Sequence, residues 1–246
     1  MALHPPAVFQ ESLTTRRAWQ STIPEACNAA LERSGIDYAT DSKEKKVLQA
    51  LAIWVEQEGK RQAETSGEHA YHNRQHISDT LTALGFFLEF DQDLSPQDKT
   101  LCLIAMLLHD FGHEGAKANK ENTNRVSQEQ RTIDLLNHPS LALLEPSQIQ
   151  TMKAWILGTH FPSVKAMHEA YLHNPSDRLL RMQAYINEAD ISASLTQALG
   201  YPLTRLFMLE RDGVEPALPE IQRTLQKFHH ECLISTPVAK HYLNRE

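Results

Sequence analysis

Two histidine- and aspartate-rich stretches of this 246-residue chain carry side chains that can hold a divalent metal and move a proton. The first, YHNRQHISD, spans residues 71–79, and the second, LLHDFGHEG, spans residues 107–115. Imidazole and carboxylate groups suit Zn, Mn, Fe or Mg, and a small set of ligands leaves positions open for water. Neither stretch contains the cysteines that are typical of closed structural zinc sites, so the pattern favours a reactive metal site.

Helical periodicity predicts that both stretches lie at helix ends. Apolar residues recur at helical spacing after the first stretch, which puts His76 and Asp79 in the first turns of a helix and leaves His72 before it. A second helix, predicted over 96–110, is apolar on nearly every side, as expected of a helix through the centre of a bundle. It ends in His109 and Asp110, and burying such a pair is costly unless a partner such as a metal is present.

Helices are expected along the rest of the chain, and no stretch alternates convincingly as a strand does. A helix is predicted from Asp41 to about Gly59, followed by a polar surface connection over 58–68. Further helices are predicted over 127–137, from 146 to a stop at Phe161-Pro162, after the cap at 174–177, and over 218–232. The fold class is therefore all-α, a single compact helical bundle.

Composition limits the possible partners and surroundings. Lys and Arg number 24 against 31 Asp and Glu, a net charge of −7 without a basic stripe, which argues against nucleic acid and means that an anionic substrate would need a local cation. Cys27, Cys102 and Cys232 lack metal-binding spacing, so we expect free thiols in a reducing compartment. The apolar run 101–108 is far shorter than the about 20 residues that span a bilayer, so the prediction is a cytoplasmic protein without a membrane partner.

Three motifs, in this order, resemble those of the HD superfamily of metal-dependent phosphohydrolases. They are YHNxxHxxD over 71–79, HDxxHxG over 109–115 and EADIS over 188–192. The first motif is similar to the corresponding motif in the catalytic domain of class I cyclic-nucleotide phosphodiesterases. The resemblance covers about residues 68–193 and implies a phosphodiesterase-like helical catalytic domain, to which we assign residues 41–246. A loosely helical apolar pattern, which Pro24 interrupts, predicts a helical lead-in over 1–40.

The resemblance also implies a role for each matching residue. The implied ligands of a first metal are His76, His109, Asp110 and Asp190. Asp110 would bridge to a second metal, and His72 would act as the general acid. The implied cofactor is one or two divalent metal ions, Zn, Mg, Mn or Fe.

A further set of residues would support the ligands or face the second metal. Asn73 and Asp79 would orient the histidines, since imidazoles at metal sites usually donate their second N–H to such a partner. His113 would contact water on the second metal. Glu129 either caps a helix or lies near this metal, and His160 occupies the position of an aspartate in the phosphodiesterases.

The predicted function is hydrolysis of a nucleotide phosphoester, with a 3',5'-cyclic nucleotide as the first guess. Two cations about 3.5–4 Å apart can hold a bridging hydroxide that attacks phosphorus. His72 would then donate a proton to the departing oxygen, a contribution typically worth about 100- to 10,000-fold. The predicted partner is thus a small phosphorylated molecule. Gln226 and Phe228 correspond only loosely to the family's base-binding residues, so no substrate-binding residue is assigned.

Three alternatives stay open. The enzyme could instead act on nucleoside 5'-phosphates or deoxynucleoside triphosphates. Some HD-fold proteins are di-iron oxygenases whose second iron takes extra histidines, and His160 keeps this class open. A helical module that keeps a metal for stability alone is the non-catalytic alternative. The sequence leaves the native metal and the oligomeric state open.

Overall fold

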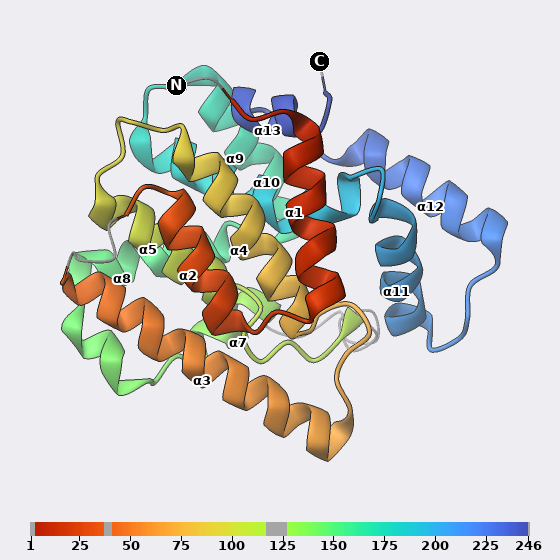
Figure 1. Ribbon diagram of the computed structural model, residues 1–246, viewed down its shortest axis with the longest axis horizontal. Helices are drawn as coiled ribbons and strands as arrows, with labels where there is room; N and C mark the ends of the chain where they lie inside the picture. Colours follow the sequence, from red (N-terminus) through yellow and green to blue (C-terminus); the bar gives the residue numbers. More distant parts are fainter. Residues whose placement is uncertain (1–2, 37–40, 117–126, 246) are drawn as a thin grey trace.

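The computed structural model describes residues 3–36, 41–116 and 127–245, and these ranges contain helices and no strand (Figure 1). The elements in chain order are α1 (Pro6–Trp19), α2 (Ile23–Arg33), α3 (Lys43–Ser66), α4 (Arg74–Glu89), α5 (Pro96–Leu108), α7 (Gln128–Leu135), the 3-10 helix η1 (Pro139–Leu143), α8 (Pro146–Leu157), α9 (Phe161–His173), α10 (Arg178–Leu195), α11 (Gly200–Asp212), α12 (Leu218–Glu231) and α13 (Pro237–Tyr242). The predicted all-α fold is confirmed.

Two side-chain caps fix the starts of the helices that carry the motifs. The Asn73 side chain accepts hydrogen bonds from the backbone N–H groups of Gln75 and His76, at 2.9 and 3.0 Å, and so starts α4. Ser95 and Asp98 form a capping box that starts α5. His76 is therefore helical and His72 precedes the helix, as the sequence predicted.

The polar stretch 58–68 is not a surface connection throughout, because α3 continues past Gly59 to Ser66. A Cβ atom at Gly59 would lie 2.6 Å from Cγ of Arg74. Glycine at this position leaves room for the Arg74 side chain to cross α3. Gly59 is therefore the site of a tertiary contact and does not end the helix. The prediction that the helix ends there was wrong.

The expected stop at Phe161-Pro162 is also corrected. Helix α8 ends earlier, at Leu157, and Phe161 and Pro162 open α9, with His160 as its N-cap residue. Proline is tolerated in the first turn of a helix, where its missing N–H would have no intrahelical acceptor. Pro24 lies in the first turn of α2 in the same way, so the lead-in consists of two helices.

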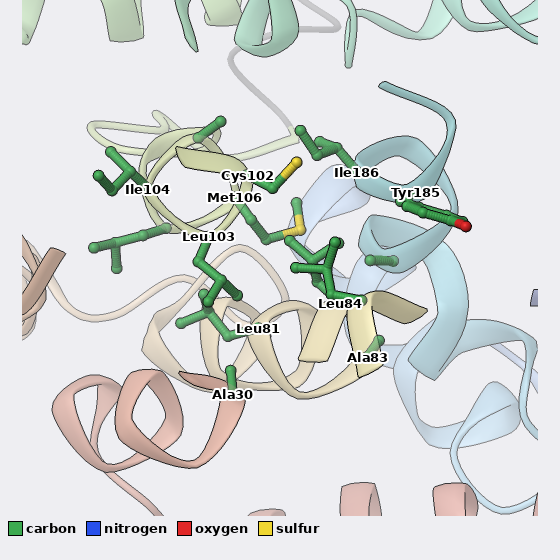
Figure 2. Packing of buried hydrophobic residues seen from close by; sticks show 14 of the residues in the cluster. Ala30, Leu81, Ala83, Leu84, Cys102, Leu103, Ile104, Met106, Tyr185 and Ile186 are labelled. Carbon is green, nitrogen blue, oxygen red and sulfur yellow. The ribbon is translucent and has the colours of Figure 1, made fainter. Parts of the chain in front are cut away.

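Helices α4 and α5 form the centre of the bundle, where their side chains interdigitate (Figure 2). From Leu101 to Leu108, no residue of α5 is more than 5% exposed, as predicted for a central helix. Helix α4 packs against α1, α2, α5 and α10. A Cβ atom at Gly85 of α4 would lie 3.0 Å from Cα of Ala30, so α2 approaches α4 closely there. The helices that carry the motifs are thus held by packing on several sides.

Helices α11 and α12 pack against each other beside α10, at the end of the molecule away from α8 (Figure 1). Within the described ranges, no helix combines the length and the apolar composition that crossing a membrane requires.

Candidate metal centre

Four side chains from three helices converge at the centre of the bundle. They are His76, His109, Asp110 and Asp190. Nε2 of His76 lies 3.1 Å from Oδ1 of Asp190 and 3.2 Å from Oδ2 of Asp110. Nε2 of His109 lies 3.3 and 3.4 Å from the same two oxygens. The structure thus brings together the four residues predicted to ligate the first metal.

Each helix delivers its ligand in a different way. His76 lies in the first turn of α4, and His109 is the C-cap residue of α5 with Asp110 just beyond it. Neighbouring residues on a regular helix point in different directions, so the helix end is what allows His109 and Asp110 to face one point. Asp190 comes from α10, which packs against both α4 and α5.

The donor atoms of the two histidines fit a divalent metal. Nδ1–H of His109 donates to the carbonyl oxygen of Met106 at 2.6 Å, which leaves Nε2 to face the cluster with its lone pair. Nε2 of His76 and Nε2 of His109 are both buried and have no hydrogen-bond partner of acceptable geometry. Buried polar atoms are normally satisfied, so two such atoms beside carboxylates indicate a place for a cation, and His76, His109 and Asp110 form a group that could hold a metal ion.

The charges of the cluster lead to the same conclusion. Burial alone would lower the pKa of His76, but the carboxylates of Asp110 and Asp190, which lie 3.2 and 3.1 Å from its Nε2, raise that pKa to about 9. Burial opposes ionisation of Asp110 and Asp190, yet the charge of the adjacent His109 imidazole holds the pKa of both carboxyls below the usual range. The two carboxyls are therefore held in the charged form, which is the form that ligates a divalent cation.

His72 lies outside this cluster and is held by a residue that the sequence did not point to. Nδ1 of His72 lies 2.6 Å from Oε1 of Glu210, in α11. The backbone N–H groups of Tyr71 and His72 donate to Oε2 of Glu210, at 2.6 and 3.0 Å, and the N–H of Ala116 donates to Oε1 at 2.8 Å. These hydrogen bonds outweigh burial and lower the pKa of Glu210 to about 2.

His113 stacks on His72, with ring centroids 3.8 Å apart and an interplanar angle of 13°. The N–H of Gly115 donates to Nδ1 of His113 at 2.8 Å, which a positive φ of 88° at Gly115 permits. Burial, and then the charge of His72, lower the pKa of His113 to about 3. His72, His113 and Glu210 form a second group whose ligand atoms lie close enough for a metal. Each Glu210 oxygen already accepts two donors, however, so this carboxylate fits an anchoring role better.

Asn73 and Asp79 have partners other than the imidazole rings. The Asn73 amide donates to the carbonyl oxygens of His69 and Ala70, at 2.9 and 3.1 Å, while its oxygen caps α4. Asn73 thus orients the backbone that carries His76. Oδ2 of Asp79 accepts from Nε of Arg17 in α1, at 2.7 Å, and its side chain is 1% exposed. The structure gives no hydrogen bond from either residue to a ring of the cluster.

Glu129 and His160 pair with each other. Oε2 of Glu129 lies 3.1 Å from Nδ1 of His160, whose side chain is 41% exposed. The Ser127 side chain caps α7 by accepting from the N–H of Gln130, so the expected cap is present while Glu129 turns toward the cluster side.

A cavity of about 470 Å³ opens beside the cluster, and this volume is within the usual range of small-molecule sites. Its wall includes both cluster carboxylates, His72, His113 and Glu129. Helices α11 and α12 add residues that the sequence did not identify as functional: Leu203, Thr204, Phe207, Arg211 and Thr224. Phe228 lines the cavity, whereas Gln226 is exposed elsewhere. A second cavity, of about 550 Å³, meets His72 and Asp110 from the α3 side and does not include Asp190.

Comparison of this chain with protein-family models and with curated proteins gave no match. The case for a function therefore depends on the geometry of this site and on the motifs.

Proposed function

We propose that this chain is a metal-dependent phosphohydrolase that acts on a nucleotide phosphoester, with a 3',5'-cyclic nucleotide as the first substrate to test. One observation carries the proposal. Two imidazole Nε2 atoms and two carboxylates from distant parts of the chain meet at 3.1–3.4 Å beside a cavity that can take a small organic molecule. The resemblance of the three motifs to HD-superfamily phosphohydrolases supports the same reaction class.

The four ligands differ in exposure, and this difference shows which side of the cluster faces the cavity. The side chains of His76 and His109 are 5% and 1% exposed, whereas those of Asp110 and Asp190 are 17% and 25% exposed and line the cavity. A divalent cation bound here supplies Lewis-acid stabilisation of a phosphoryl group and an activated water. The imidazoles would therefore bind the metal from the interior of the protein, and the side of the metal that faces the cavity would stay open to substrate.

His72 is the residue placed to move a proton. Glu210 accepts a hydrogen bond at Nδ1 and fixes the orientation of the ring, so Nε2 is the nitrogen left for substrate. His72 lines the same cavity as Asp110 and Asp190 without belonging to their cluster. An unligated imidazole at this place can donate a proton to the departing oxygen, which is worth about 100- to 10,000-fold in rate.

The test combines turnover with metal content. The chain loaded with Mn²⁺, Mg²⁺ or Zn²⁺ is assayed on cyclic AMP, cyclic GMP, nucleoside 5'-phosphates and deoxynucleoside triphosphates. We expect His72→Ala to lose at least about 100-fold in kcat while its metal content is unchanged, and Asp190→Asn to lose metal. His173→Ala, an exposed histidine of α9, is the matched control.

The outcomes separate the alternatives. Turnover of 5'-phosphates or triphosphates alone would replace the phosphodiester by a phosphomonoester or triphosphate substrate. Metal binding without turnover of any of these compounds would contradict the proposal and favour a non-catalytic module. His160, which kept the oxygenase class open, pairs with Glu129 and belongs to neither ligand group among the described residues, so we do not propose that class.

A further inference from the structure

Arg211, near the end of α11, brings a positive charge to the cavity. Among the described residues that line the cavity, it is the one with a permanent positive charge, while Asp110, Asp190 and Glu129 contribute carboxylates. The chain as a whole has a net charge of −7, so an anionic ligand depends on local cations. This arginine is not used in the mechanism described above.

Arg211 is separate from the metal centre. Its ion-pair partner is Asp212, and neither Asp110 nor Asp190 lies within 4.0 Å of the guanidinium. The guanidinium carbon lies 5.9 Å from the centroid of the Phe207 ring, and the His72 ring lies 6.2 Å from the same centroid. Arg211 and His72 thus border one aromatic side chain on the cavity wall, and the guanidinium marks a second binding position.

The pair with Asp212 leaves the guanidinium able to take another anion. The two side chains are 34% and 27% exposed, and water screens such pairs strongly. Asp212 engages Nε and Nη2 of Arg211, whereas a guanidinium offers five N–H donors in a planar fork. This fork matches the oxygens of a phosphate group in a bidentate fashion.

The wall of the cavity suits the organic part of a nucleotide. Leu203, Phe207 and Phe228 provide apolar surface, and Thr204 and Thr224 provide hydroxyl groups. A flat base can pack on aromatic rings, while hydroxyl groups can bond to its edge or to the ribose. A ligand that reaches from the metal centre to Arg211 along this wall has an anionic group at each end.

We propose that Arg211 forms a second phosphate-binding position of the cavity, so that the site accepts, besides nucleotides with a single phosphate group, nucleotides with one phosphate group at the metal centre and another apart from it. The identity of the group at the metal centre rests on the proposed function. The second position rests on Arg211 and its surroundings alone.

The test measures binding, so that it does not depend on turnover. The full chain, loaded with Mn²⁺ and carrying His72→Ala so that no ligand is consumed, is titrated calorimetrically with adenosine 5'-phosphate and with the 2',5'- and 3',5'-bisphosphates. We expect at least one bisphosphate to bind about 10- to 100-fold more tightly than the monophosphate. Arg211→Gln should remove this advantage and change monophosphate binding by less than about 3-fold. Arg211→Lys should keep part of the advantage, because the charge remains without the fork.

Arg205→Gln is the matched control, because Arg205 lies on the same helix, pairs with Glu215 and does not line the cavity. It should leave both ligands unaffected, and circular dichroism verifies that each variant is folded. Equal weakening of monophosphate and bisphosphate by Arg211→Gln would overturn the proposal, since Arg211 would then bind the phosphate at the metal centre. Bisphosphates that bind no better than the monophosphate would overturn it too. A bisphosphate advantage that requires Arg211, in a chain without hydrolytic activity, would uphold this inference while the proposed function fails.

Discussion

Replacing Glu210 by glutamine should destabilise the chain more than any ordinary loss of one surface charge. The two carboxylate oxygens accept hydrogen bonds from Nδ1 of His72 and from three backbone N–H groups, those of Tyr71, His72 and Ala116. The side chain of Glu210 is 5% exposed. Glutamine keeps one oxygen and presents an NH₂ group in place of the other. With the NH₂ at the position of Oε2, the N–H groups of Tyr71 and His72 lose their acceptor; with the NH₂ at the position of Oε1, the N–H of Ala116 loses its acceptor and Nδ1 of His72 must accept in the other tautomer.

The size of the effect follows from the number of lost acceptors. A buried donor that is left unsatisfied costs about 1–3 kcal/mol, so the loss of one or two acceptors lowers the free energy of unfolding by about 1–6 kcal/mol. For a chain of this length, that corresponds to a fall in Tm of about 2–24 °C. The pKa of Glu210 is about 2, against an ordinary value of 4.5. The carboxylate therefore stabilises the fold above pH about 4.5, and this contribution is lost as the pH falls toward about 2.

Urea denaturation and thermal unfolding, followed by circular dichroism at neutral pH and again near pH 3, measure this difference. Glu215→Gln is the control, because Glu215 is an exposed partner of Arg205 on the same side of the molecule, and its change should stay below about 1 kcal/mol. If Glu210→Gln unfolds like the wild type at neutral pH, the hydrogen-bond network around Glu210 does not stabilise the fold. If the free energies of unfolding of the wild type and of Glu210→Gln differ by the same amount at both pH values, the assignment of the effect to the carboxylate charge is wrong.

Three further predictions concern the cluster and its support. The affinity of the cluster for metal should rise with pH, by about tenfold per pH unit for each displaced proton, up to about pH 9. The reason is that His76 has a pKa of about 9 and must lose its proton before Nε2 can ligate. A constant affinity for Mn²⁺ between pH 6 and 8 would contradict this prediction. Arg17→Gln should lower the free energy of unfolding by about 2–4 kcal/mol, because it leaves the buried Asp79 carboxylate without its cation, and most of this loss should vanish in an Asp79→Asn background. Gly85→Ala should lower it by about 1–3 kcal/mol in urea denaturation, because the new Cβ would lie 3.0 Å from Cα of Ala30; an unchanged or raised stability would show that α2 can move away at little cost.

Local patterns predicted the helices that carry the first two motifs because those helices follow local rules. The start of α4 at Asn73 and the start of α5 at Ser95 are set by side-chain caps within three residues. The continuous apolar surface of Leu101–Leu108 could be satisfied only in the middle of the bundle, where the structure places it. Once such a helix is central, residues at its end must face the interior, which is why His109 could be identified as a ligand candidate.

Helix α9 was missed because it lacks the stripe of buried apolar residues that periodicity detects. Phe161 and Leu172 are 71% and 61% exposed, and the buried residues of the helix are His168 and Tyr171. The end of α3 was misplaced for a related reason, since the contact of Gly59 with Arg74 exists only in the tertiary structure.

Glu210 gives no comparable signal in the sequence. It lies 20 residues after Asp190 in the sequence, in a charged run at the end of α11 that has the pattern of a solvated helix face. Its function as an acceptor depends on backbone N–H groups that come from two loops, near Tyr71 and Ala116. Such groups have no side-chain identity, so a search for motifs cannot find the carboxylate that they surround. Arg211, the next residue, lies in the same charged run, so the sequence gives it the pattern of a solvated helix face as well.

The candidate site therefore depends on more of the chain than the motifs at 68–193. Arg17 in α1 neutralises the buried Asp79 in the helix that carries His76, and α1 and α2 both pack against that helix. On the other side, α11 anchors His72 through Glu210. A fragment that begins at residue 41 would lack the cation for Asp79 and would expose the face of α4 that α1 and α2 cover. The two helices of the lead-in are thus a structural condition for holding His76 in place, and the helix after α10 has the same importance for His72.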